Sequence, residues 1–158
     1  MNIATRRLRL FGTGAVLAAL GLIFSTTPAQ AAITYEKKLA NWASGNDAGG
    51  RDASARLVTS GGTTHYKALF RAYDEKVHVY DYYKETPTID TPGYAEVNVF
   101  DRNDNLVERR AYGVWWSQDG WTYELDINGN YDIPEGYKIQ LRMCVDGGSC
   151  TGWVYGVA

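Results

Sequence analysis

Residues that hold metals or carry redox chemistry are scarce in this chain. Its 158 residues include only two cysteines, Cys144 and Cys150, and two histidines, His65 and His78. A structural zinc site needs four ligands, and thioredoxin-like chemistry uses Cys-x-x-Cys at the start of a helix. We therefore expect no metal site and no cofactor. Both histidines are interpreted as ordinary surface or sheet-face residues, so we also expect no catalytic site and no enzyme activity.

Apolar segments long enough to cross a membrane are absent after the start of the chain. The start itself has the three parts of an export signal: a basic end with Arg6, Arg7 and Arg9, an apolar run, and small residues before Ala31. We therefore expect residues 1–31 to be removed on export and the mature protein to be secreted. The general secretory route is favoured, and the Arg6-Arg7 pair leaves the twin-arginine route open.

Acidic side chains outnumber basic ones once that signal is removed. The 16 basic side chains fall to 13 against 18 acidic ones, a net charge of about −5. Nucleic acids and anionic lipids both bind basic surfaces, so we expect neither as a partner. Other secreted proteins are the expected partners, and a glycan is the alternative.

The first part of the mature chain, residues 32–64, is expected to be an N-terminal arm followed by a Gly/Ser-rich linker. The arm, "AITYEKKLANW", alternates only weakly. The linker, "ASGNDAGGRDASARLVTSGGTT", contains one apolar pair, Leu57-Val58, which is too little to hold a fixed conformation. The arm is expected to be flexible. Three states are open to it: disorder, pairing with its own domain, or donation to a partner's sheet edge.

From His65 onward, apolar and polar residues alternate with the period of two that is typical of strands. No segment shows a helical stripe, and polar turns separate the alternating segments at intervals of about 8 to 12 residues. This pattern predicts an all-β antiparallel β-sandwich of about seven to eight strands over residues 65–158, with an Ig-like sandwich or a small barrel as the alternative. The expected strands are "YKALFRAY", "VHVYDYY", "YAEVNVF", "LVERRAYGVWW", "WTYEL", "YKIQLRM" and "TGWVYGV".

The stretch "CVDGGSC" is expected to close the last hairpin with a disulfide bond between Cys144 and Cys150. If the two cysteines face each other, Leu141 lies opposite Trp153, and apolar side chains meet along both strands. The sequence therefore predicts a bond on the face opposite Leu141 and Trp153.

The loop "DINGNYDIPEG" places several oxygen ligands between Asp126 and Glu135. It lacks the glycine and glutamate positions of an EF-hand, and its Asn-Gly step is typical of a tight turn. We interpret the loop as a hairpin turn and leave calcium binding open.

Aromatic residues give the strongest hint of a binding surface, with five tryptophans and twelve tyrosines. Exposed Trp and Tyr suit both protein interfaces and the flat faces of sugars. Adjacent residues of a strand point to opposite faces, so one of Trp115 and Trp116 is expected to be exposed. The candidate partner-binding residues are Ile33, Tyr35, Leu39, Trp42, Trp115 and Trp116.

The segments "YKALFRAYDEKVHVYD" and "CVDGGSCTGWVYG", after an export signal and a Gly/Ser-rich lead, resemble those of small secreted β-sandwich proteins of filamentous actinobacteria. Within that group the chain is similar to the small adaptor subunits of umbrella toxin particles. The resemblance implies a secreted, non-catalytic adaptor that links a large toxin subunit to a lectin-bearing subunit. The alternatives are a carbohydrate-binding module, or an inhibitor of a secreted enzyme that acts through the loop "KETPTIDTPG".

Overall fold

The computed structural model describes residues 34–82, 91–114 and 120–158, which belong to one compact unit, Ala32–Ala158. The export signal expected over 1–31 lies outside the described residues. All strand pairings are antiparallel. The strands are β1 (Tyr35–Ala43), β2 (Arg51–Thr59), β3 (Thr64–Arg71), β4 (Lys76–Asp81), β5 (Gly93–Phe100), β6 (Leu106–Val114), β7 (Gly120–Glu124), β8 (Lys138–Val145) and β9 (Val154–Val157).

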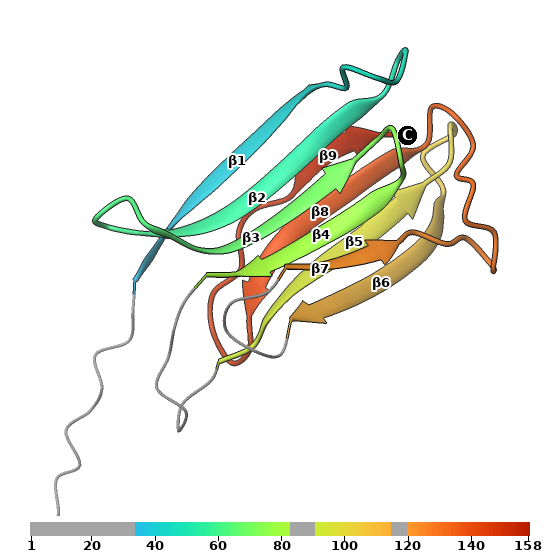
Figure 1. Cartoon of the computed structure of the whole chain (residues 1–158). Helices are drawn as coiled ribbons and strands as arrows, with labels where there is room; N and C mark the ends of the chain where they lie inside the picture. Colours follow the sequence, from blue (N-terminus) through green and yellow to red (C-terminus); the bar gives the residue numbers. More distant parts are fainter. Residues whose placement is uncertain (1–33, 83–90, 115–119) are drawn as a thin grey trace, which may run out of the picture. The chain divides into compact units, whose positions relative to one another are not determined.

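The strands form two packed layers (Figure 1). One layer has the order β1-β2-β3-β4-β7, and the other has the order β6-β5-β8-β9. A bridge between Arg51 of β2 and Val157 of β9 joins them into one sheet. At the far side of the sheet, the rings of Tyr112 on β6 and Tyr123 on β7 lie 4.7 Å apart. The sheet is therefore nearly closed into a barrel, and the predicted all-β antiparallel fold is confirmed.

The core lies between the layers and is built from alternate residues of each strand. Tyr66, Ala68 and Phe70 of β3 are buried, as their alternation predicted. Across from them, β5 and β8 contribute small and medium apolar side chains that fill the space between the sheets. These residues are Ala95, Val97, Val99, Ile139, Leu141 and Met143.

Residues 43–64 do not form the linker that their composition predicted. Strand β2 lies within this segment and pairs with β1 on one side and with β3 on the other. Its residues Ala53, Ala55 and Leu57 are completely buried. The prediction was wrong because alanine and serine are common in linkers, but they also suit a strand that is covered on both faces. Glycine is confined to the turns at either end of β2, so the domain begins with β1 and not at residue 65.

The predicted arm is strand β1, which pairs with β2 along its whole length, from Tyr35↔Thr59 to Ala43↔Arg51. At its start, the Tyr35 hydroxyl lies 3.3 Å from His65 Nδ1, and the Tyr35 ring contacts Tyr66 edge-on. Of the three states left open by the sequence, the structure shows pairing within the domain. The expected flexibility is therefore wrong for residues 35–43.

The C-terminal hairpin carries the predicted disulfide bond between Cys144 and Cys150, which face each other. A crosslink of this length contributes about 2 kcal/mol by the loop-entropy model. The predicted register beyond the bond is wrong by one residue, because Leu141 pairs with Val154 and not with Trp153.

The shift in register arises at Thr151. Its N–H donates to the Met143 carbonyl, and its hydroxyl accepts a hydrogen bond from the Met143 N–H. This arrangement inserts one extra residue on the β9 side, as in a β-bulge. Val154 then points into the core, whereas Trp153 lies outside, where its ring contacts the Arg142 guanidinium at 4.5 Å.

The loop from Asp126 to Glu135 contains the predicted tight turn. Asn128 and Gly129 both have positive φ and close a bridge between Ile127 and Asn130. An Asn-Gly pair suits this conformation because both residues tolerate positive φ.

Candidate functional site

The first candidate surface is the outer edge of β1, which pairs only with β2 among the described residues. The Ser44 N–H donates to the Gly50 carbonyl, which fixes the hydrogen-bonding phase of the β1–β2 ladder. Hydrogen-bonded pairs alternate along an antiparallel ladder. The backbone groups of even-numbered β1 residues therefore face β2, while those of Lys37, Leu39 and Asn41 face the open edge.

Two of the predicted partner-binding side chains lie exposed on this strand. Leu39 is 44% exposed and Trp42 is 40% exposed, and they project from opposite faces of β1 because their positions differ by an odd number. Tyr35 contacts His65 and Tyr66 instead and holds the start of the strand. Ile33, Trp115 and Trp116 lie outside the described residues.

The second candidate surface is a row of aromatic rings on the outer side of β4. His78, Tyr80 and Tyr82 follow each other on one face, with ring centroids 6.3 Å and 5.5 Å apart and nearly parallel planes. The Tyr80 ring occupies the space that a Cβ atom would need at the position of Gly120 in β7. On its other side, Lys67 Nζ lies 5.3 Å from the Tyr80 ring centroid. The middle ring of the row is therefore held by both neighbouring strands.

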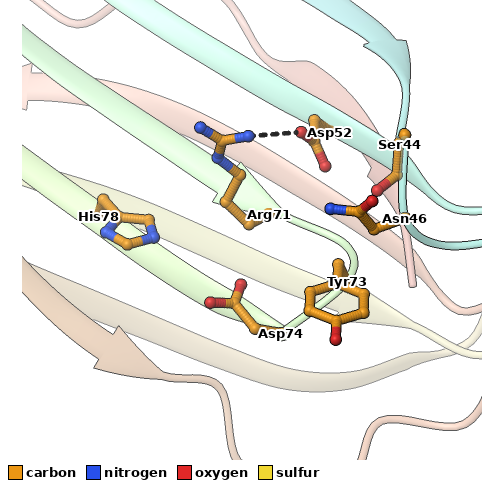
Figure 2. A pocket seen from close by; sticks show the side chains of 8 residues that line it. Ser44, Asn46, Asp52, Arg71, Tyr73, Asp74 and His78 are labelled. Atoms are coloured by element: carbon orange, nitrogen blue, oxygen red, sulfur yellow. Dashed lines mark hydrogen bonds and ion pairs between the residues drawn. The ribbon is translucent and has the colours of Figure 1, made fainter.

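A hollow of about 310 Å³ lies at one end of this row, between the β1–β2 turn and the β3–β4 turn (Figure 2). The Arg71 guanidinium lies 3.3 Å from the buried carboxylate of Asp52, which also accepts the Ala72 N–H. Asp52 thereby fixes the position of Arg71 at the hollow. The side chains labelled in Figure 2 are Ser44, Asn46, Asp52, Arg71, Tyr73, Asp74 and His78.

His78 belongs to both the row and the hollow. Its Nδ1 lies 2.9 Å from the Thr122 hydroxyl. Burial, the largest cause, lowers the pKa of His78 below its ordinary value, and the positive charges of Arg71, Lys76 and Lys67 act in the same direction against Asp74. The imidazole is therefore neutral at neutral pH and can donate one hydrogen bond and accept another.

Lys67 stands in a cluster of positive charge beside the row. Burial lowers the pKa of Lys67, and the nearby Arg56 and Arg71 lower it further. Among the described residues neither Lys67 nor Arg56 forms an ion pair. The ammonium of Lys67 instead interacts with the face of Tyr80.

Sequence reasoning found the aromatic row but not the hollow. The period of two in the expected strand "VHVYDYY" puts His78, Tyr80 and Tyr82 on one face, although this pattern by itself indicates no binding role. The hollow combines residues of two turns and three strands, and each of them alone has the composition of an ordinary turn or strand end. No sequence signal marked Asp52, because it lies in the segment predicted as a linker.

In the part of the chain that the structure describes, no group of three or more His, Cys, Asp or Glu side chains is arranged to hold a metal ion. The described residues also contain no helix with the length and apolarity needed to span a bilayer.

Comparisons with known proteins do not identify a relative of this chain. No protein-family model matches it, and comparison with curated proteins and with solved structures gave no significant match. What the protein binds is therefore inferred from the open edge of β1, the aromatic row and the hollow.

Proposed function

We propose that the protein is a secreted, non-catalytic protein-binding module that acts as an adaptor in an extracellular, toxin-like complex. The observation that carries this proposal is the open edge of β1, a nine-residue strand that pairs on one side only among the described residues. An open edge of this kind can accept a strand from another protein, because its unpaired N–H and C=O groups continue the ladder.

The side chains of β1 suit a specific partner. Leu39 and Trp42 offer apolar contacts on the two faces of the strand, so an added strand meets an anchor on either side. Lys37 and Lys38 place positive charge on the strand, which opposes pairing of the edge with a second copy of itself. Lys38 is paired with Glu36 at 2.8 Å, whereas Lys37 is exposed. We expect the partner strand to carry an acidic residue opposite Lys37.

Secretion agrees with two features of the chain. The disulfide bond between Cys144 and Cys150 is of a kind that persists in oxidising compartments outside the cytosol. The start of the sequence has the parts of an export signal. The adaptor role in a toxin complex rests on the resemblance of the sequence to umbrella toxin adaptors. The inhibitor alternative depends on a loop that falls mainly within residues 83–90, outside the described part of the chain.

The open-edge proposal is tested with Lys37→Pro, which removes an edge-facing N–H without removing a hydrogen bond to β2. The tagged mature protein is used to capture partners from the culture fluid of the producing organism, and captured proteins are quantified by mass spectrometry. We expect the wild type to hold a stoichiometric secreted partner and Lys37→Pro to capture at least about tenfold less, which corresponds to about 1.4 kcal/mol.

The matched control is Lys37→Ala, which removes the side chain and keeps the N–H. This variant should capture nearly as much partner as the wild type. Equal capture by Lys37→Pro and the wild type, at unchanged circular dichroism, would show that the partner does not bind this edge. Equal loss in both variants would assign binding to the lysine side chain and would likewise contradict strand addition.

A further inference from the structure

We propose that the outer face of β3 and β4 carries a second binding site, which takes a neutral glycan. One sugar sits in the hollow between the β1–β2 and β3–β4 turns, and the following sugars lie along His78, Tyr80 and Tyr82. This site uses a different surface from the open edge of β1, so it does not depend on the proposed adaptor function.

The hollow offers the mixed hydrogen-bonding chemistry that sugar hydroxyls require. Its volume of about 310 Å³ lies at the lower end of the range of small-ligand sites. Asn46 and Ser44 each offer a donor and an acceptor, while Arg71 only donates and Asp74 only accepts. A hydroxyl group both donates and accepts, so adjacent hydroxyls of one sugar match such a set of partners.

The charges around the hollow favour a neutral ligand. Arg71 is paired with Asp52 at 3.3 Å, and Lys76 is paired with Asp74 at 3.7 Å, so the two positive charges are offset by two negative ones. The neutral imidazole of His78 adds hydrogen-bonding capacity without adding charge. The side-chain charges that could bind an ionic ligand are therefore already engaged in ion pairs. A neutral polyol does not need a free charge, so these ion pairs do not weaken its binding.

The aromatic residues extend the hollow on two sides. Tyr73 is 68% exposed in the β3–β4 turn, and Tyr82 is 49% exposed at the far end of the row. Tyrosine rings combine an apolar plate with a polar tip, which suits the C–H faces and hydroxyls of sugars. Tyr80, between Gly120 and Lys67, is held in place before a ligand arrives. A site held in this way loses less conformational entropy on binding.

The positive charges beside the row would favour a different ligand, an acidic glycan. Arg56 and Lys67 form no ion pair within the described residues, but Lys67 is engaged with the Tyr80 ring and its pKa is lowered by burial first and by Arg56 and Arg71 after it. These charges lie beside the row and not in the hollow, where the polar contacts are concentrated. Neutral sugars are therefore the expected ligands.

The test measures binding of the mature protein to an array of neutral hexose and N-acetylhexosamine oligosaccharides, printed beside uronic acid oligosaccharides. The best neutral ligand is then titrated by calorimetry. We expect binding to neutral oligosaccharides, and we expect Tyr82→Ala and Tyr73→Ala each to weaken it at least about tenfold. Both side chains are largely exposed, so neither change removes core packing.

The matched control is Tyr131→Ala, which removes a tyrosine of intermediate exposure, 60% against 68% for Tyr73 and 49% for Tyr82, from the Asp126 to Glu135 loop and should leave affinity unchanged. Lys37→Pro should also bind the oligosaccharide normally, which separates this site from the open edge of β1. Binding to no neutral glycan, binding confined to uronic acid oligosaccharides, or neutral binding that survives both Tyr73→Ala and Tyr82→Ala would overturn the proposal.

Discussion

Replacing Leu57 with alanine is expected to lower the free energy of unfolding by about 2 to 5 kcal/mol. Leu57 is fully buried in the second half of β2, between β1 and β3, and its side chain reaches the shared core. Its truncation removes apolar contacts and leaves a cavity that a two-layer sheet closes only partly. Urea unfolding followed by tryptophan fluorescence, with both slope and midpoint fitted, measures the change.

This prediction separates a core strand from the linker that the composition of residues 43–64 indicated. A linker residue would change stability by no more than about 0.5 kcal/mol when replaced. Arg56→Ala serves as the control, because Arg56 is the neighbour of Leu57 on the outer side of the same strand and forms no ion pair in the described part of the chain. If Leu57→Ala and Arg56→Ala have the same small effect, β2 is not a core strand.

The second large effect is expected for Gly156→Ala, which should destabilise the fold by about 1 to 3 kcal/mol through overpacking. A Cβ on Gly156 would lie 2.6 Å from the Phe70 ring and 2.7 Å from the Arg51 carbonyl oxygen. The ring can shift, but the carbonyl belongs to the bridge between β2 and β9 that joins the two layers. The added methyl group would therefore strain the backbone at the point where the sheet passes from one layer to the other.

Gly152→Ala provides the control for this change. A Cβ at Gly152 would have one neighbour within 4 Å, the end of the Leu39 side chain at 3.4 Å. A flexible leucine side chain can move away by a few tenths of an ångström. Thermal unfolding of both variants should show a lower midpoint for Gly156→Ala and little change for Gly152→Ala. Equal midpoints would contradict the close approach of β9 to β2 and β3.

The parts of the fold that could be predicted from sequence are those where one face is apolar and the other polar. β3, β4, β5 and β8 alternate in this way, and all four were expected. β2 could not be recognised because Asp52, Ser54 and Val58 are also buried, which leaves Arg56 as the part-exposed residue of that alternate set. Burial on both faces removes the alternation on which such a prediction depends.

The register of β9 shows a second limit. The match of Leu141 with Trp153 looked complete because the alternate positions that include these two residues are apolar on both strands. The bulge at Thr151 depends on the hydrogen bond that its hydroxyl accepts from the Met143 N–H. The alternation of apolar and polar residues gives no indication of this bond. Trp153 and Tyr155 are accordingly outside, where Trp153 contacts Arg142 and Tyr155 accepts a hydrogen bond from Gln140.

The candidate site was predictable only in part for a similar reason. The alternation in "VHVYDYY" places the rings of His78, Tyr80 and Tyr82 together, because that grouping is local. Asn46, Asp52 and Arg71 come together only because the turns between β1 and β2 and between β3 and β4 lie at the same end of the sheet. Their spacing in the sequence gives no indication of this.

Hydrogen exchange along β1, measured by NMR on the free mature protein, tests most directly whether this strand is ordered and open at its edge. The hydrogen-bonding phase fixed by Ser44 and Gly50 predicts slow exchange at the even-numbered residues Glu36, Lys38 and Ala40, and fast exchange at the odd-numbered residues Lys37, Leu39 and Asn41. Fast exchange at all six amides would show a free arm, and slow exchange at all six would show an edge that is already covered. Either result would contradict an ordered strand that offers its edge to a partner.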